Sequence, residues 1–394
     1  MIFDVQEMNE LNIEVIDGDR GKNYPHQDEL YEKGDCVFLS ANNVTSSGFK
    51  FDSLVFITAA KDQALRNGKL QRGDIVITTR GTVGNVGLYN DSIPYDDVRI
   101  NSGMLIIRCH QGIYNEYLYD ALRSYYFQQQ IKQIQTGTAQ PQLPKSHFLK
   151  MKIMVPPIDI QKRIASVIGN IDRKIGCNDE INKNLLEQAQ ALYKDRYIDL
   201  SPFYGKIPNG WHIGTVSEII ELHDSKRIPL SSREREKLDK IYPYYGATSV
   251  MDYVDRYLFD GIYLLLGEDG TVIDDKGFPI LQYVEGKFWV NNHAHIITGK
   301  CGFTVELLYL LFSLTNVKFI VTGAVQPKIS QANLNKVPVL IPDIIELKSF
   351  DSVIQPFFAQ IRNLRAENNR LATLRDTLLP RLMSGEIDVS GIDL

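Results

Sequence analysis

One phrase occurs twice in this sequence of 394 residues, and its repetition constrains the fold more than any other feature. The first copy starts at residue 136 and reads TGTAQPQLPKSHFLKMKIMVPP; the second starts at residue 322, an offset of 186, and reads TGAVQPKISQANLNKVPVLIPD. Both contain T-G-x-x-Q-P, then a polar stretch, then a short apolar strand that ends at proline. A unit repeated at a fixed offset indicates two domains of one fold, and a chain of this length is expected to hold more than one core.

The repeated unit extends upstream of this phrase. A short β-rich run followed by glycines occupies 73–87, and its counterpart occupies 261–272. An asparagine stands five residues before an Ile-Ile pair in NSGMLIIR (101–108) and again in NNHAHIIT (291–298). A helical stretch follows in each half, and the glycine and proline of the TG…QP turn end it. Each half therefore predicts strands, a helix, a polar loop and a closing strand, which together make a mixed α/β domain.

A long helix is predicted after each domain. Apolar residues recur in alternating steps of four and three, at seven of nine positions in each helix, and this spacing is typical of a coiled-coil seam. The two series match at an offset of 190, asparagines included. We expect the helices to pair antiparallel; the alternative is that each packs only on its own domain. The seam positions are Ile164, Ile168, Ile171, Ile175, Asn178 and Leu185 in the first helix, and Ile354, Phe357, Ile361, Leu364, Asn368 and Leu371 in the second.

The predicted fold class is α+β: two similar mixed α/β domains separated by two long antiparallel coiled-coil helices, with an approximate two-fold internal repeat. We expect the first domain over 1–154, its helix over 155–200, the second domain over 201–342, and the second helix with a tail over 343–394. A helix over 159–196 would be roughly 57 Å long. Two similar domains held apart at a fixed spacing suit a DNA duplex as the ligand.

Charge is distributed unevenly along the chain. The net charge of −5 is unlike that of a typical nucleic-acid binder. However, residues 60–152 hold 12 Lys or Arg against 7 Asp or Glu, and residues 286–341 hold 5 Lys against one acid. Each basic window ends in its copy of the repeated phrase. A local basic patch can hold phosphates on an acidic chain, and the alternative is a scatter of charges on solvated faces.

The sequence predicts a cytoplasmic protein. It has no run of about 18 uncharged apolar residues, and its first ten residues are acidic, so we expect neither a membrane-spanning helix nor a signal peptide. The four cysteines are far apart and form no C-x-x-C pair, as is usual for free thiols in a reducing compartment.

Three further segments match the pattern of a known family. VPPIDIQKRIASVIGNID (155–172) has the P-P-x-x-x-Q-x-x-I pattern, ALYKDRYIDLSPFYGKIPNGW (191–211) joins the first helix to the second domain, and LLPRLMSGEIDV (378–389) ends the second helix. With the repeated TG…QP phrase, these segments make the chain resemble the DNA specificity subunit of type I restriction-modification systems over nearly its whole length. The first domain departs from the pattern because it lacks the IPNGW lead-in, and the second helix has PDIIELKS where the first has PPIDIQKR.

The resemblance implies a non-catalytic scaffold without a cofactor. Each target-recognition domain would read one half of a bipartite double-stranded DNA sequence, and the helices would set the gap between the halves. The family assembles with two modification (adenine methyltransferase) subunits and with restriction subunits that hydrolyse ATP and cut DNA. The alternative function is a two-domain protein-interaction adaptor without DNA readout.

Catalytic motifs are poorly matched. Adenine methylation needs a D/N-P-P-Y/F/W loop, but the only similar segment, VPPID, has Val155 at its first position. An acid-acid-x-Lys order at Asp274 or Asp275 with 285–287 could hold Mg²⁺, yet E-G-K is interpreted more simply as a hairpin turn. His293 and His295 would share a strand face without further zinc ligands nearby, so we expect polar residues lining a surface and no metal.

The candidate DNA contacts lie on glycine-marked and polar loops, because direct readout uses Arg, Lys, Asn, Gln, Ser and Thr that can enter a groove. Gln140 and Gln326 recur in both domains, so we expect them to position the DNA, with their unrepeated neighbours reading bases; the Thr-Gly pairs at 136–137 and 322–323 have an equally good structural interpretation. The candidates are Arg20, Lys22, Thr79, Arg80, Thr82, Asn85, Thr138, Gln140, Gln142 and Lys145 in the first domain, and Lys226, Arg227, Tyr244, Tyr245, Asp269, Thr271, Asn292, His293, Gln326 and Lys328 in the second.

Overall fold

In both halves of the chain, the strand that ends the repeated phrase pairs with the strand that opens its domain. In the computed structural model, β1 (Asp4–Glu7) is antiparallel to β11 (Lys152–Val155), and β12 (His212–Thr215) is antiparallel to β19 (Pro338–Ile341). The opening element of the first domain is therefore present although the IPNGW lead-in is missing. We call residues 3–155 domain 1 and residues 212–341 domain 2.

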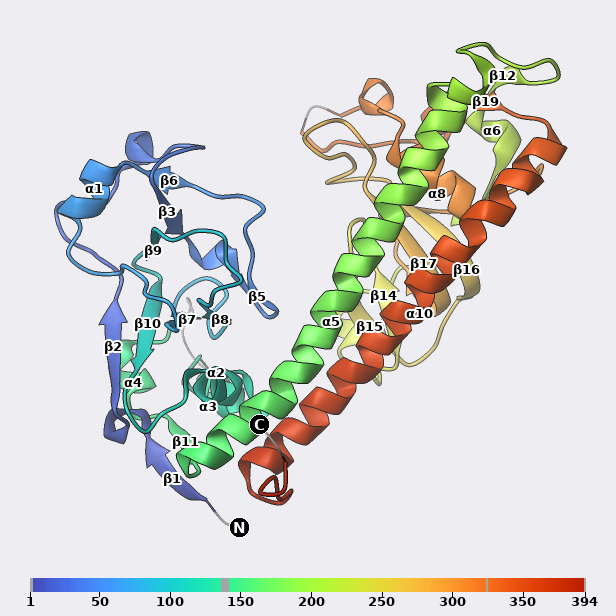
Figure 1. Cartoon of the computed structure of the whole chain (residues 1–394). Helices are drawn as coiled ribbons and strands as arrows, with labels where there is room; N and C mark the ends of the chain where they lie inside the picture. Colours follow the sequence, from blue (N-terminus) through green and yellow to red (C-terminus); the bar gives the residue numbers. More distant parts are fainter. Residues whose placement is uncertain (1–2, 136–141, 324, 393–394) are drawn as a thin grey trace. The chain divides into compact units, whose positions relative to one another are not determined.

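The structure describes residues 3–135, 142–323 and 325–392 (Figure 1). These residues form two compact units. Unit 1 contains Met1–Gly176 and Asn368–Leu394, and unit 2 contains Cys177–Glu367. Each long helix contributes one part to each unit.

The main sheet of domain 1 has four antiparallel strands in the order β2-β10-β7-β8. Its central strands are buried on both faces, because successive side chains point to opposite sides. Ile75 and Ile77 pack toward the helices, whereas Val76 packs toward the second sheet, β6-β3-β9. The strands are β2 (Ile13–Asp17), β3 (Cys36–Leu39), β4 (Val44–Thr45), β5 (Gly48–Phe49), β6 (Phe56–Ile57), β7 (Ile75–Thr78), β8 (Val86–Leu88), β9 (Val98–Ile100) and β10 (Met104–Cys109); the helices are α1 (Ala59–Ala64), α2 (Asn115–Arg123), α3 (Tyr125–Gln135) and α4 (Lys145–Phe148).

Domain 2 repeats this plan with longer strands. Its six-stranded sheet has the order β13-β18-β16-β17-β14-β15. Leu264 and Leu266 pack on α8, and Leu265 packs on the opposite side with Phe259 and Phe288. The elements are α6 (Val216–Ile219), β13 (Ile220–Leu222), α7 (Ser232–Arg235), β14 (Tyr242–Tyr245), β15 (Val250–Val254), β16 (Phe259–Gly267), β17 (Leu281–Val290), β18 (Ala294–Gly299), α8 (Val305–Ser313) and α9 (Gln331–Leu334).

The expected hairpin turn at residues 285–287 is wrong. These residues lie inside β17, where Gly286 is the partner of Gly261 on β16. Both glycines have positive φ, 83° and 137°, which other residues rarely adopt. The glycines therefore allow two long strands to continue past an irregular pair.

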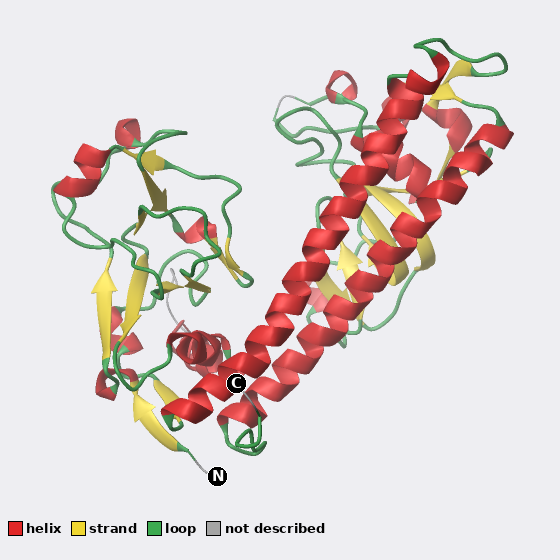
Figure 2. Ribbon diagram, in the orientation of Figure 1, coloured by secondary structure: helices red, strands yellow, loops and turns green. Residues whose placement is uncertain are grey.

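The two long helices are α5 (Ile158–Tyr193), which continues as a π-helical turn over Lys194–Ile198, and α10 (Ile344–Met383) (Figure 2). They run antiparallel in each unit. In unit 1, Arg375 contacts Asp172 at 2.8 Å and the Asn368 amide donates to the Ile175 carbonyl at 3.5 Å. In unit 2, the Asn178 amide donates to Glu367 at 2.9 Å. The predicted helix pair is thus confirmed.

The seam residues also pack on the domains, which the helical periodicity did not show. Ile164 and Ile168 belong to the core that includes α2 of domain 1, and Ile354 belongs to the core of domain 2. Phe358 is buried more deeply than the predicted seam residue Phe357, because its ring packs against Tyr283 at 5.2 Å. Pairing and domain packing therefore occur together on the same helices.

No helix within the described ranges is long and apolar enough to cross a membrane.

Candidate nucleic-acid interface

The polar loops of domain 1 meet at one end of its main sheet. We call residues 79–85, 101–103 and 142–145 the rim of domain 1. The Thr79 amide donates to the Gly103 carbonyl at 2.7 Å, and the Leu143 amide donates to the Thr79 carbonyl at 3.0 Å. The Asn101 side chain accepts from the Gly103 amide at 2.9 Å. Three segments far apart in sequence are thereby joined by backbone.

Domain 2 has the same hydrogen bonds at the equivalent positions. We call residues 267–271, 291–293 and 326–328 the rim of domain 2. The Glu268 amide donates to the His293 carbonyl at 2.8 Å, and the Ile329 amide donates to the Glu268 carbonyl at 2.9 Å. The Asn291 side chain accepts from the His293 amide at 2.8 Å. The two rims therefore share one backbone frame and differ in the side chains mounted on it.

An aspartate and an arginine support each frame. Arg20 contacts Asp17 at 3.4 Å and donates to the Ser102 carbonyl at 3.2 Å. In domain 2, Arg227 contacts Asp224 at 3.4 Å and donates to the Asn292 carbonyl at 3.4 Å. Both arginines were predicted to contact DNA. Arg227 is largely buried and also contacts Glu268 at 2.6 Å, so the structure places it beneath the surface as a support.

The glycine-rich turn of domain 1 exposes Arg80. Gly81 and Gly84 have φ values of 71° and 96°, and a Cβ on Gly84 would lie 2.9 Å from the Gln128 side chain. Gly84 therefore allows the turn to lie close to α3. Asn85 donates to the Val44 carbonyl at 2.8 Å and faces inward. Arg80 is exposed, and its side chain has no partner among the residues that the structure describes.

A buried charged cluster lies under the rim of domain 2. His295 is 0% exposed, and its ring nitrogens face the Asp224 carboxylate at 2.6 Å and the Ile329 carbonyl at 2.8 Å. Both ring nitrogens are therefore engaged by oxygen atoms of the protein. Lys328 contacts Glu268 at 3.2 Å. The expectation that His295 lines a surface is wrong, because the residue stands on a buried strand where domain 1 has Leu105.

The carboxyl groups of this cluster are held in their charged form. Burial by itself would raise the pKa of Asp224, but hydrogen bonds from His295, the Ile296 amide and Gln331 lower it below its ordinary value. For Glu268, burial again opposes the shift, and Arg227 lowers the pKa most.

Two carboxylates and a histidine within 4.8 Å resemble a metal-ligand set. Here Arg227 and Lys328 compensate the carboxylate charges, and both nitrogens of His295 have partners. We therefore interpret the cluster as a structural support of the rim. The recurrence of D-x-x-R at 17–20 and 224–227 is the sequence signal that could have revealed it.

The other candidates fall into exposed and internal groups. Lys145 donates to the Val15 carbonyl at 2.5 Å, and Thr82 donates to the Ala41 carbonyl at 3.5 Å. Tyr244 is 1% exposed and Tyr245 packs edge-on to Phe288, so neither offers a ring to a base. Thr79 is buried. The exposed candidates are Lys22, Thr82, Gln142, Lys226, Thr271, Asn292, Gln326 and Lys328, to which the half-exposed His293 and its less exposed partner Asp269 are added; Thr138 and Gln140 lie outside the described residues.

Most of the basic residues that give domain 1 its positive excess form ion pairs within the domain. Lys69 contacts Asp62 and Asp97 at 2.7 Å, and Arg108 contacts Asp74 at 2.8 Å. The charge counts of the sequence therefore overstate the surface available to phosphates, and individual exposed cations such as Arg80 become more informative.

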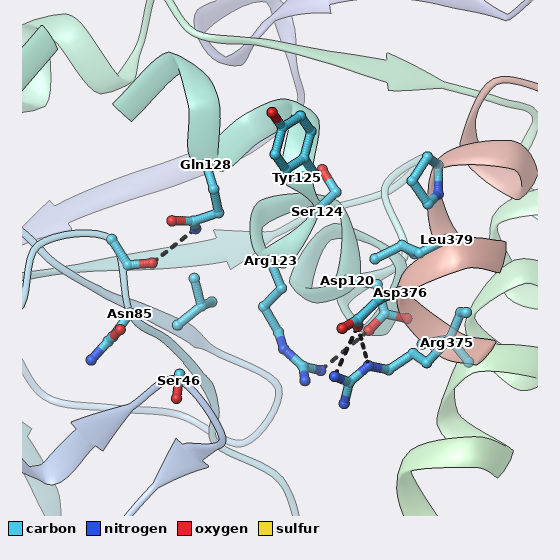
Figure 3. Close-up of a pocket in the computed structure, with 14 residues that line it drawn as sticks. Ser46, Asn85, Asp120, Arg123, Ser124, Tyr125, Gln128, Arg375, Asp376 and Leu379 are labelled. Atoms are coloured by element: carbon cyan, nitrogen blue, oxygen red, sulfur yellow. Dashed lines mark hydrogen bonds and ion pairs between the residues drawn. The ribbon is translucent and has the colours of Figure 1, made fainter. Parts of the chain in front are cut away.

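A second polar region of unit 1 is a cavity of about 570 Å³ between α2, α3 and the long helices. Figure 3 shows Arg123 and Arg375 pointing toward one another beside Asp120. Both arginines bind Asp172, at 2.9 and 2.8 Å. Burial alone would raise the pKa of Asp172, but the two guanidinium groups lower it. This network fixes domain 1 to the helices.

Unit 2 has an ionic anchor of its own. Arg362 on α10 contacts Glu306 on α8 at 3.1 Å and donates to the Tyr283 hydroxyl at 2.6 Å. The Tyr283 hydroxyl in turn contacts Glu306 at 2.6 Å. Domain 2 is thus held on its helix through a buried carboxylate and an arginine.

The chain carries two domains of one fold, each with the same rim frame, and comparison with known proteins identifies the family. The family model described as type I restriction modification DNA specificity domain matches residues 11–187 and 208–373. The chain therefore belongs to this family and carries two copies of its domain.

Curated relatives agree with this assignment. The chain is 25% identical over 359 residues to the type I restriction enzyme MjaIX specificity subunit of Methanocaldococcus jannaschii, covering 85% of this chain and 82% of the relative. It is 24% identical over 464 residues to the HindI specificity subunit of Haemophilus influenzae, covering 94% and 98%. Its fold is similar to the crystal structure of the type I restriction-modification system S subunit from M. genitalium, with a TM-score of 0.54 and 15% identity over 97% of this chain and 96% of that one.

Proposed function

We propose that this chain is the sequence-reading, non-catalytic subunit of a type I restriction-modification complex, and that each domain reads one half of a bipartite DNA target. The single observation that supports this function best is the shared backbone frame of the two rims. Thr79 and Glu268 occupy the same position in the frame, as do Gly103 and His293. One frame with different side chains is what two readers of different half-sites require.

The exposed side chains on the rims suit a DNA ligand. Asn292, Gln326 and Lys328 offer amide and ammonium groups, which contact base edges and phosphates in grooves. Lys22 and Lys226 follow the supporting aspartates in the two domains and are exposed, so we assign them to phosphate contacts.

The helices are the proposed docking surface for two modification methyltransferase subunits, through which the restriction subunits join the complex. Ile345, Val353 and Leu374 expose large apolar side chains on α10. Apolar residues left on the outside of a paired helix fit an obligate partner better than solvent. The specificity-subunit relatives support the same role, with methylation and cleavage supplied by other chains.

Co-expression with the modification subunit of the same host provides the test. We expect the purified complex to select a bipartite duplex from a randomised library, with an affinity that falls steeply as salt rises. Adenine methylation mapped in a host carrying both chains should show the same two half-sites. A complex that forms but has no sequence preference would favour the adaptor function instead.

A further inference from the structure

We infer that the two domains carry their principal base-reading side chain at one equivalent place on the rim: Arg80 in domain 1, and His293 oriented by Asp269 in domain 2. This inference deepens the proposed DNA readout and rests on it. It assigns different roles to three residues that the sequence placed in one undivided set of candidates.

The equivalence follows from backbone contacts. The Thr79 amide donates to the Gly103 carbonyl, and the Thr79 carbonyl accepts from the Leu143 amide. Glu268 makes the same two bonds with His293 and Ile329. The next residues along the chain, Arg80 and Asp269, therefore occupy matching positions. The acceptors of the first bond, Gly103 and His293, match in the same way.

The two positions also lie side by side in both domains. A Cβ built on Gly103 would lie 3.7 Å from the Cβ of Arg80. In domain 2 the corresponding side chains are in contact, because Nδ1 of His293 meets Oδ1 of Asp269. Domain 1 thus has an arginine at the first position and a glycine at the second, whereas domain 2 has side chains at both positions.

The chemistry of the pair in domain 2 favours the imidazole as the reader. A carboxylate facing DNA would be repelled by phosphates, but the Asp269 side chain is only 19% exposed and lies against the ring. The His293 side chain is 43% exposed. Because Nδ1 donates to the carboxylate, the second ring nitrogen, Nε2, is the atom available to a base edge.

Nearby charged groups support this orientation. Lys328 is bridged through its backbone to Asp269 and contacts Glu268, while Arg227 donates to the Asn292 carbonyl next to His293. Arg227 and Lys328 both contact the Glu268 carboxylate, and the Glu268 amide donates to the His293 carbonyl. The backbone that carries the His293 ring is therefore tied to this ionic cluster.

Arg80 has the complementary properties of a direct reader. The frame around it is complete without its guanidinium, which has no partner among the described residues. An arginine free to enter the major groove makes two parallel bonds to guanine O6 and N7. We therefore expect guanine at one position of the half-site read by domain 1, and a different, singly contacted base at the equivalent position of the other half-site.

The test uses the complex with its modification subunit and a duplex library randomised in both half-sites. We expect Arg80→Ala to lower discrimination at one position of one half-site by about 10- to 100-fold and to leave the other half-site unchanged. His293→Ala should relax one position of the other half-site. Arg80→Lys should restore only part of the discrimination, because an ammonium cannot form the paired bonds.

Asp269 is a positioning residue in this proposal. Asp269→Asn should relax the same base position as His293→Ala, and the double variant should be no worse than His293→Ala alone. A purely structural role would instead lower the thermal midpoint without moving base preference. Lys226→Ala is the matched control: it should weaken binding to all sequences alike and reduce the salt dependence.

Failure of the two proposals can be distinguished. If the wild-type complex selects no DNA sequence, the proposed function itself fails. The wild-type complex could instead discriminate between sequences while Arg80→Ala and His293→Ala weaken binding to all duplexes equally or leave the selected motif intact. In that case the assignment of the base-reading residues is overturned and the proposed function stands.

Discussion

Two aspartates beside Arg123 in unit 1 should respond to the same substitution with opposite changes in stability. Asp172 accepts from Arg123 and Arg375 at 2.9 and 2.8 Å. Asp120, 4% exposed, lies 3.7 Å from the nearest guanidinium nitrogen of Arg123, beyond hydrogen-bond distance. Replacing either residue with asparagine keeps the size of the side chain and removes one carboxyl group.

Asp172→Asn is expected to destabilise unit 1. Removing one partner of a fully buried ion pair costs about 3–5 kcal/mol, because the remaining charge is left without compensation. The Asp172 side chain is 29% exposed, so solvent screens part of this loss. We expect the free energy of unfolding to fall by about 1–3 kcal/mol. Each kcal/mol lost should lower the thermal midpoint by about 2–4 °C.

Asp120→Asn is expected to stabilise unit 1 at neutral pH. Burial raises the pKa of Asp120 well above its ordinary range, because Arg123 only partly offsets the loss of solvent. Between the unfolded and the raised folded pKa of a carboxyl group, each unit of rising pH costs about 1.4 kcal/mol of stability, because only the unfolded chain has ionised. An uncharged amide avoids this cost, and we expect a gain of about 1–2 kcal/mol at pH 7.

The pH dependence separates the two effects. The pKa of Asp172 is lowered in the folded chain, so its stabilisation is complete above the unfolded pKa of about 3.9 and is lost only as pH falls through the folded value. Its deficit should thus be constant from pH 5 to pH 7. The pKa of Asp120 is raised, so its cost grows as pH rises from about 3.9, and the gain from Asp120→Asn should grow over the same range.

Thermal unfolding of the two variants and the double variant at pH 5, 6 and 7 is the assay. Because both aspartates face Arg123, the double variant should not equal the sum of the single changes. If Asp120→Asn lowers the midpoint at pH 7, or if its effect does not change with pH, Asp120 is a charged ligand of Arg123 and the reasoning from burial is refuted.

Three further predictions concern the helices and the division of readout. Gln161 accepts from the Tyr114 amide at 2.8 Å and donates to two carbonyls. Gln161→Ala should therefore lower the free energy of unfolding by about 1–3 kcal/mol. Thermal denaturation measures this effect against Lys162→Ala, a control at an exposed position. Replacing residues 1–150 with those of a relative should change one half of the methylated motif; a change in both halves would contradict independent domains. If the length of α5 sets the gap between half-sites, four residues inserted near Leu185 lengthen it by about 6 Å, and methylation mapping should show a gap longer by about one or two base pairs.

The repeat in the sequence was sufficient to predict the two long helices, the closing strands and the strands that carry the Ile-Ile pairs. It did not predict the second sheet of domain 1 or the continuous strand over residues 285–287. The reason is that hydrogen-bond frames depend on spacing more than on side-chain identity. Asn101 and Asn291, each five residues before an Ile-Ile pair, form the same turn in both domains. The closing strand and its partner likewise recur, although the first domain lacks the IPNGW lead-in.

The direction of individual side chains could not be predicted in the same way. Arg227 and Tyr244 are of residue types that often contact DNA. Their environments, however, are formed by residues at other positions along the chain. Glu268, 41 positions away, draws Arg227 inward, and the Leu230 amide donates to the Tyr244 hydroxyl at 3.0 Å in the core. A polar residue in a loop pattern indicates a candidate, and only its three-dimensional partners decide whether it is available to a ligand.

The same limit explains an asymmetry that the repeat conceals. Asp172 and Arg362 are 190 residues apart, at matching positions of the two helices, but they carry opposite charges. Asp172 binds Arg123 of domain 1, and Arg362 binds Glu306 of domain 2. Exchanging the helices between the domains would bring two cations together in one case and two carboxylates in the other. Like charges at a buried contact cost stability, so these anchors specify which helix each domain accepts while the backbone repeat stays the same.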